Sequence, residues 1–292
     1  MPVYELRPNP VEPAGADRRS VAFVLGGGGN LGAIQVGMLR ALAQRGVAPD
    51  ALFGCSVGAI NAAALAADPS PSGVERLTQF WSQLDSEVVC PPGRLSGLLL
   101  LTRKYRSLQS NDALARILES ALPYRKIEET AVPLQVVATS LRTGREHWFT
   151  HGPVVPAVLA SSALPAVFPP VVIGGESFID GAVVDNVPIS RAAEAGATRI
   201  YVLHVGNFER PRPEPKRPID ALLQSFSIAR NYRFHAETRS PPPGVELVVL
   251  PSVDPGVIKP NDFGQSRALI ARASAAAGAF LDADRPMAAG AD

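Results

Sequence analysis

The chain has 292 residues, of which 46% are hydrophobic and 19% are charged, with a formal net charge of +1 at pH 7. A chain of this size can bury one large core, and its small net charge argues against nucleic acid as a partner. Its two cysteines, Cys55 and Cys90, are too few for a disulfide framework or a cysteine-based metal cluster. We therefore expect a reducing compartment, no metal and no cofactor.

The two ends of the chain are predicted to lie outside the folded domain. Residues 1–19 are rich in proline and contain no apolar run, which predicts a disordered leader. Residues 284–292 are expected to be a flexible tail, so that residues 20–283 form one domain. No signal peptide and no uncharged apolar stretch of about 18 residues is visible. The expected location is cytoplasmic, with peripheral contact with a membrane as a second option.

The first predicted strand, Val21–Leu25, leads directly into a glycine-rich segment at residues 26–32, which reads GGGGNLG. A short apolar run with β-branched members is typical of a strand buried on both faces of a parallel sheet. Glycines permit positive φ and can point backbone N–H groups at an anion, and the helix predicted next begins with unpaired N–H groups. We therefore expect Gly27, Gly28 and Gly29 to hold an oxyanion or a phosphate.

A second short strand, predicted at residues 51–53, is followed by a Gly-x-Ser-x-Gly run and an alanine-rich helix. A serine on a tight strand-to-helix turn is held with its Oγ exposed near helix N–H groups, which is the geometry of a nucleophile elbow. Gly54 and Gly58 are required because a Cβ at either position would clash with the crossing backbone. Ser56 is the predicted nucleophile, and Cys55 is interpreted as a small buried filler.

The rest of the chain predicts further helices and strands in alternation, with no internal repeat. Residues 95–108 combine a leucine run with basic residues; we favour a helix packed on the core, with contact to anionic lipid headgroups as the alternative. Residues 208–218 are read as an exposed, proline-rich basic linker. Helices are expected at residues 71–84, from 110, at 154–163, up to 196, at 219–238 and at 263–281. Strands are expected at residues 134–139, 145–150, 171–173, 177–179, 199–205 and 245–250.

One acidic residue lies where a side chain can reach into a site. Asp180 ends the second strand of the predicted hairpin at residues 171–179 and is followed by Gly181. Asp-Gly is also a common turn dipeptide, so this position alone does not distinguish a catalytic carboxylate from a simple turn.

Two other readings of these motifs stay open. A Ser-His-Asp triad needs a histidine on a loop after the last strand, whereas His204 is predicted inside a strand and His235 on a long helix, and His147 and His151 flank a hairpin strand. The segment around residues 27–32 also fits the dinucleotide fingerprint, but that motif needs an acid after the second strand, and Asp50 precedes it.

Taken together, the motifs resemble those of the patatin-like phospholipases, in particular compact bacterial members. The resemblance extends over residues 21–205. It rests on the glycine-rich loop that ends at Gly32, the elbow from Gly54 to Gly58, Asp180-Gly181-Ala182, residues 161–170 and residues 186–188. The chain departs from the family pattern at Leu31, where Arg or Lys is usual.

The resemblance implies a three-layer α/β/α fold with a central, mostly parallel sheet and a Ser-Asp dyad in place of a triad. Ser56 would attack a lipid ester, Asp180 would accept its proton, and Gly27, Gly28 and Gly29 would hold the oxyanion, with Gly32, Gly54, Gly58 and Gly181 as supporting glycines. The implied partner is a phospholipid, lysophospholipid or other lipid ester. The oligomeric state and the acyl and headgroup preference are not determined by the sequence. A catalytically weak or silent lipid-binding relative is the alternative that Leu31 favours.

Overall fold

The computed structural model describes residues 20–84, 110–165, 167–206, 214–215, 218–256, 258 and 262–283. The predicted leader, the predicted tail, the basic segment at 95–108 and most of the linker at 208–218 lie outside this part of the chain. The predicted domain boundaries therefore stay predictions.

A mixed sheet lies at the centre, and within the described residues it has eight strands. Its order is β5-β6-β3-β2-β1-β7-β8, and β4 pairs with β3. β1, β2, β3, β7 and β8 are parallel to one another, whereas β4, β5 and β6 are joined by antiparallel pairings. The strands are β1 Val21–Leu25, β2 Ala51–Cys55, β3 Leu134–Ser140, β4 Glu146–Phe149, β5 Val171–Ile173, β6 Glu176–Asp180, β7 Arg199–Leu203 and β8 Glu246–Val249.

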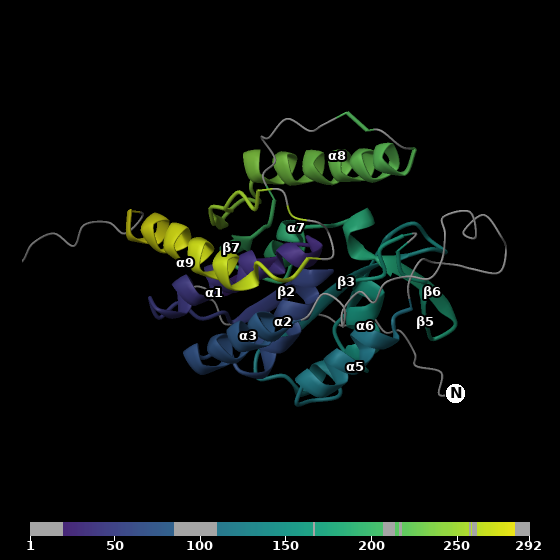
Figure 1. The fold of residues 1–292 in the computed structure, drawn as a ribbon, viewed down its shortest axis with the longest axis horizontal. Helices are drawn as coiled ribbons and strands as arrows, with labels where there is room; N and C mark the ends of the chain where they lie inside the picture. Colours follow the sequence, from purple (N-terminus) through teal and green to yellow (C-terminus); the bar gives the residue numbers. More distant parts are fainter. Residues whose placement is uncertain are drawn as a thin grey trace, which may run out of the picture.

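Helices cover both faces of this sheet, so the predicted α/β/α fold is confirmed (Figure 1). The helices are α1 Gly32–Ala43, α2 Val57–Ala67, α3 Pro71–Gln83, α5 Asp112–Ala121, α6 Val154–Ser161, α7 Ile189–Glu194, α8 Pro218–Arg239 and α9 Ser266–Ala283. The described residues also contain three short 3-10 helices, η1 Gly29–Leu31, η3 Ile127–Glu129 and η4 Gly181–Val183. In Figure 1, α7 and α8 lie on one side of the sheet, and α1, α2 and α3 lie on the other side.

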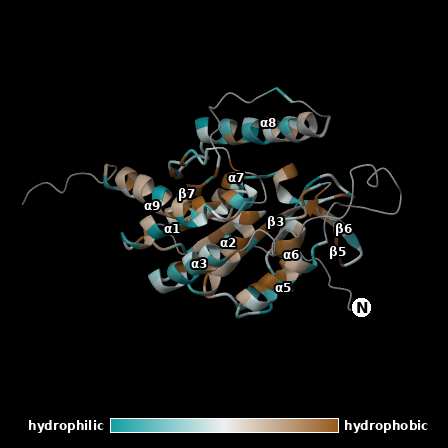
Figure 2. Cartoon of the chain, in the orientation of Figure 1, coloured by the Kyte–Doolittle hydropathy of each residue, from teal (hydrophilic) through white to brown (hydrophobic). Residues whose placement is uncertain are grey.

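The alternation of side chains along β1 divides the core into two layers. Phe23 and Leu25 belong to the larger cluster with α1, α2, α3 and α9, whereas Ala22 and Val24 pack with residues of α7 and with Phe234 of α8. Strand β3 is buried at every position, as expected for a strand covered on both faces. In Figure 2, β3 and α6 are largely hydrophobic, while α8 carries hydrophilic and hydrophobic residues side by side.

Several element boundaries differ from the predicted ones, and the differences in β2, β7 and β4 bear on the candidate site. β2 continues to Cys55, which pairs with Val137 of β3. β7 ends at Leu203, so His204 follows the strand instead of lying inside it. β4 lies within the strand predicted at residues 145–150, so His147 is part of this strand and does not flank it.

The register around β3 brings two strand ends together. On one edge of β3, β4 pairs with both Val137 and Ala138. Their partners on the other edge are Cys55, which ends the parallel strand β2, and Asp180, which ends the antiparallel strand β6. Because β2 and β6 run toward each other along this edge, their carboxyl ends meet at neighbouring register positions.

Candidate active site

Ser56 lies at the turn between β2 and α2, in a backbone conformation that is unusual for a residue with a side chain. Its φ is 54° and its ψ is −125°, and it is the one non-glycine residue with positive φ in the described ranges. Such a conformation costs on the order of 1–3 kcal/mol and persists only where the surroundings impose it. The turn therefore has the sharp geometry that was predicted for an elbow, and it presents Ser56 at the end of β2.

The two elbow glycines lie where no side chain fits. A Cβ on Gly54 would lie 2.6 Å from the Cα of Ala59, and one on Gly58 would lie 2.0 Å from the carbonyl oxygen of Leu25. Both obstacles are backbone atoms, which cannot rotate away as a side chain can. The start of α2 therefore packs closely against β1 and β2 on either side of Ser56.

Asp180 accepts a hydrogen bond from the hydroxyl of Ser56. Ser56 Oγ donates a hydrogen bond to Asp180 Oδ2 at 2.8 Å, and the backbone N–H of Ala182 donates to Asp180 Oδ1, also at 2.8 Å. The Asp180 side chain is almost entirely buried, and the backbone around it is held by Thr139 Oγ1, which donates to the Asp180 carbonyl oxygen at 2.8 Å. The structure thus brings together the two residues that the sequence singled out as nucleophile and base.

Burial raises the pKa of Asp180 from 3.8 to about 6. The hydrogen bonds from Ala182 and Ser56 and the positive charge of Arg230 act in the opposite direction, but loss of solvation is the larger effect. A carboxylate whose pKa lies near neutrality is a stronger base than a solvated one and still ionised at pH 7.

Cys55 lies directly before the nucleophile, and its side chain is fully buried. Its thiol lies 3.9 Å from Asp180 Oδ1, and burial together with the charges of Asp180 and Asp185 raises the thiol pKa well above its ordinary value. A thiol in this environment stays protonated and is a poor nucleophile. This agrees with its interpretation as a small buried filler.

The glycine-rich loop packs against the nucleophile. A Cβ on Gly27 would lie 3.1 Å from the Cβ of Ser56 and 2.6 Å from Asn186 Oδ1. Gly29 has a φ of 60° and open space around its Cβ position, and a Cβ on Gly28 would lie 1.8 Å from a methyl group of Val205. The loop can therefore approach Ser56 because Gly27 and Gly28 have no side chains that would clash with their neighbours.

One of the three expected oxyanion donors forms a backbone hydrogen bond in this structure. The N–H of Gly27 donates to the carbonyl oxygen of Asn186 at 3.1 Å, so this group is already engaged. Gly27 therefore acts as an anchor of the loop, and Gly28 and Gly29 remain as candidate N–H donors. The sequence held no sign of this bond, because its acceptor lies far along the chain, beyond β6.

A series of buried, hydrogen-bonded side chains, which the sequence did not reveal, anchors the first residue of the glycine-rich loop. Gln35 Nε2 donates to the carbonyl oxygens of Gly26 at 2.6 Å and Leu203 at 2.9 Å. Asn61 Nδ2 donates to Gln35 Oε1 at 2.8 Å, and Trp81 Nε1 donates to Asn61 Oδ1 at 2.7 Å. Polar residues inside the alanine-rich helices α1 and α2 were the only available signal.

Three further residues support the elbow. Ser161, at the end of α6, accepts the backbone N–H of Ser56 through its Oγ at 2.9 Å. A Cβ on Gly181 would lie 2.5 Å from the carbonyl oxygen of Val137, so the Asp-Gly turn sits tightly on β3. A Cβ on Gly32 would lie 2.4 Å from a methyl group of Val57, so α1 starts in close contact with α2.

The two competing interpretations fit the structure less well. Ser56 Oγ donates to a carboxylate and not to an imidazole, as a Ser-His-Asp triad would require. Asp50 lies before β2, and its side chain accepts the N–H of Val21 at 2.9 Å, at the opposite end of the strands from the glycine-rich loop. A dinucleotide site would need an acid at the carboxyl end.

In the described part of the chain, no group of three or more His, Cys, Asp and Glu side chains could hold a metal ion. None of the helices in these same ranges is long and apolar enough to cross a bilayer.

Comparison with known proteins adds a family. A family model described as patatin-like phospholipase matches residues 23–193. The chain is 30% identical over 190 residues to patatin-like phospholipase domain-containing protein 7 of Rattus norvegicus, covering 64% of this chain and 14% of that protein. It is 28% identical over 200 residues to lysophospholipase nte1 of Aspergillus terreus, covering 67% of this chain and 12% of that protein. The chain thus spans about one seventh or less of the length of these relatives.

Among solved structures, VipD from Legionella pneumophila aligns with a TM-score of 0.46 at 14% identity, covering 91% of this chain and 67% of that chain.

Proposed function

This chain belongs to the patatin-like phospholipase family, and we propose that it is a serine hydrolase of lipid esters that acts on phospholipids or lysophospholipids. The observation that carries the proposal is the 2.8 Å hydrogen bond from Ser56 Oγ to the buried Asp180 carboxylate. A lysophospholipase among the relatives supports the substrate class.

In the first half of the reaction, Ser56 Oγ attacks the ester carbonyl carbon while Asp180 accepts the hydroxyl proton. The carbonyl oxygen becomes an oxyanion, which the N–H groups of Gly28 and Gly29 stabilise. Collapse of the tetrahedral intermediate breaks the bond to the leaving alcohol, and Asp180 returns the proton to that alcohol. The product at this stage is an acyl-enzyme on Ser56.

In the second half, Asp180 accepts a proton from water, and the resulting hydroxide attacks the acyl-enzyme. The second tetrahedral intermediate releases the fatty acid, and the proton returns to Ser56 Oγ. One carboxylate serves both steps because its pKa of about 6 lets it accept a proton at pH 7 and release it again.

A second candidate is a lipid-binding protein with weak or no turnover. It is favoured by Leu31, a partly buried apolar residue at the end of η1 that packs against the main core. The loop from residue 26 to residue 32 therefore brings no cation toward the developing oxyanion. Loss of one oxyanion-stabilising group typically lowers the rate by roughly 10² to 10³.

Hydrolysis of p-nitrophenyl butyrate and of 1-palmitoyl lysophosphatidylcholine by wild type, Ser56→Ala and Asp180→Asn tests the proposal. We expect both variants to lose at least about 10³ of kcat/KM, and Ser56→Ala to lose labelling by a fluorophosphonate. Ser225→Ala serves as a control on α8, because Ser225 is exposed and its Oγ donates to the carbonyl oxygen of Ala221 within the helix, and His235→Ala tests the triad.

Each alternative has its own outcome in this experiment. Activity retained in Asp180→Asn but lost in His235→Ala would replace the dyad with a triad. A wild type that neither turns over nor reacts with the fluorophosphonate would leave the lipid-binding candidate, and Leu31→Arg would then show whether the missing cation is the reason.

A further inference from the structure

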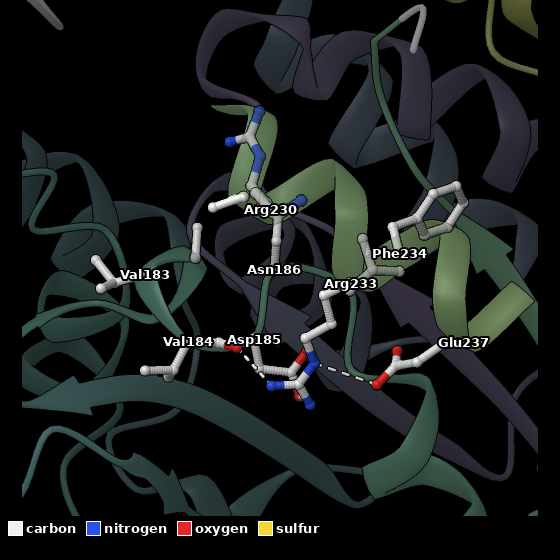
Figure 3. Close-up of a pocket in the computed structure, with 11 residues that line it drawn as sticks. Val183, Val184, Asp185, Asn186, Arg230, Arg233, Phe234 and Glu237 are labelled. Carbon is white, nitrogen blue, oxygen red and sulfur yellow. Dashed lines mark hydrogen bonds and ion pairs between the residues drawn. The ribbon is translucent and has the colours of Figure 1, made fainter. Parts of the chain in front are cut away.

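A pocket of about 200 Å³ lies between α8 and the segment that follows Asp180 (Figure 3). One wall of this pocket is the chain from Ala182 to Val187, which includes Asn186. One water molecule needs roughly 10–15 Å³ of such space, so the pocket is large enough to admit several waters. It therefore offers a route by which water can come close to the candidate active site.

The pocket adjoins the nucleophile at the end where Ala182 and Asn186 line it. A Cβ placed on Gly27 would lie 3.1 Å from the Cβ of Ser56, 3.6 Å from the Cβ of Ala182 and 2.6 Å from Asn186 Oδ1. These three side chains thus surround the same face of the glycine-rich loop. Since two of them also line the pocket, water that enters the pocket can reach the side of Ser56.

Asn186 has a fixed backbone and a side-chain oxygen without a donor. Its carbonyl oxygen accepts the N–H of Gly27 at 3.1 Å, and the residue is only 6% exposed. Its Oδ1 is buried and has no hydrogen-bond partner within the described residues, whereas its neighbour Arg233 in Figure 3 is tied to Glu237. A buried acceptor without a donor is costly. Because χ2 of an asparagine is soft, the amide can turn Oδ1 toward the pocket without a change in the backbone.

Acylation of Ser56 would open a second acceptor nearby. In the structure, Ser56 Oγ donates to Asp180 Oδ2 at 2.8 Å, and the N–H of Ala182 donates to Asp180 Oδ1 at 2.8 Å. Once Oγ carries an acyl group it has no proton to donate, so Oδ2 loses its donor. A water molecule has two protons and is held in one orientation when both find acceptors. Asp180 Oδ2 and Asn186 Oδ1 are two such acceptors on the pocket side of Ser56.

We propose that Asn186 positions the water that hydrolyses the acyl-enzyme. This inference rests on the proposed function, since it needs an acyl group on Ser56. As the water oxygen bonds to the acyl carbonyl carbon, one proton moves to Asp180, and the other stays on the oxygen and donates to Asn186 Oδ1. The bond from that carbon to Ser56 Oγ then breaks, Asp180 returns its proton to Oγ, and the fatty acid leaves. Asn186 gains and loses no proton, so it is a positioning residue.

Competition between water and methanol for the acyl-enzyme tests this role. Methanol has one hydroxyl proton, which goes to Asp180, so it needs no second acceptor. With p-nitrophenyl butyrate in aqueous methanol, we expect Asn186→Leu to raise the ratio of methyl butyrate to butyric acid at least about tenfold over wild type. Asn186→Ala, which removes the same oxygen without adding volume, should also raise the ratio. Asn186→Asp keeps an acceptor oxygen and should stay near the wild-type ratio.

Rapid mixing measures the two halves of the reaction separately. In Asn186→Leu the release of p-nitrophenol in the burst should stay within about twofold of wild type, whereas decay of the acyl-enzyme should slow at least about tenfold. The matched control is Asn111→Leu, the same substitution at the start of α5, which should change neither rate nor the product ratio. Unfolding temperatures establish which variants are folded.

Two results would overturn the inference while leaving the proposed function intact. One is a wild-type product ratio in Asn186→Leu and Asn186→Ala. The other is an equal loss of burst rate and deacylation rate, which a purely structural role predicts. The proposed function is decided separately, by whether Ser56→Ala abolishes hydrolysis and fluorophosphonate labelling. A wild type that forms no acyl-enzyme would overturn both.

Discussion

Lowering the pH through 6 is expected to switch off hydrolysis, because the proposed base is buried. With a pKa of about 6, Asp180 is a carboxylate in roughly a tenth of molecules at pH 5 and in roughly nine tenths at pH 7. A solvated aspartate, with its ordinary pKa of 3.8, would be more than roughly nine tenths ionised at both values. Between pH 7 and pH 5 the rate should therefore fall by a factor of about 10.

The assay is kcat/KM for p-nitrophenyl butyrate from pH 4.5 to 8.5, followed at the isosbestic wavelength of the product. The ester does not titrate in this range, so the profile reports groups of the free enzyme. In Arg230→Gln the midpoint should move to higher pH, because the charge of Arg230 lowers the pKa of Asp180. Arg239→Gln, which removes one positive charge from the last turn of α8, should keep the wild-type midpoint.

Two results would refute this reasoning. A wild-type midpoint near pH 4 would mean that water reaches Asp180 and that burial does not tune it. A profile without any titration between pH 5 and 7, in a protein that circular dichroism shows to be folded throughout, would exclude Asp180 as the base.

Four further outcomes follow from the same contacts, each measured by urea unfolding alongside activity. The folded pKa of Asp180 lies above its unfolded value, so the stability that the protonated carboxyl contributes is present below pH 4 and is lost as the pH rises through 6. The unfolding free energy of Asp180→Asn, which cannot ionise, should therefore rise by about 3 kcal/mol relative to that of wild type between pH 4 and pH 8. Ser56→Gly should abolish activity yet raise stability by about 1 kcal/mol, because glycine tolerates a φ of 54°; lower stability would contradict this. Gly58→Ala should cost at least about 3 kcal/mol, because its Cβ meets the Leu25 carbonyl oxygen, and wild-type stability would contradict this close approach of α2 to β1. Gln35→Leu should cost about 3 kcal/mol and lower kcat, because two carbonyl oxygens behind the loop lose their donor; an unchanged kcat would limit Gln35 to stability.

The local motifs were predictable because their signals lie within a few residues of one another. Residue type alone predicts the conformation of three segments: the strand Val21–Leu25, the glycine-rich loop and the Gly-x-Ser-x-Gly turn. The structure has β1, η1 and the turn at Ser56 in these places. Such signals depend on backbone sterics and on short-range hydrophobic periodicity, which do not need the rest of the chain.

Contacts between distant segments could be read only from the folded chain. The sequence by itself indicated that Ser56 follows a strand and that Asp180 ends one, but their meeting depends on β2 and β6 sharing one edge of β3 in opposite directions. Tertiary structure alone also decided that the N–H of Gly27 bonds Asn186 and that α8 brings Arg230 beside the segment after Asp180. The physical reason is that strand register and helix packing are set by burial across the whole core, whereas residue type constrains only the local backbone.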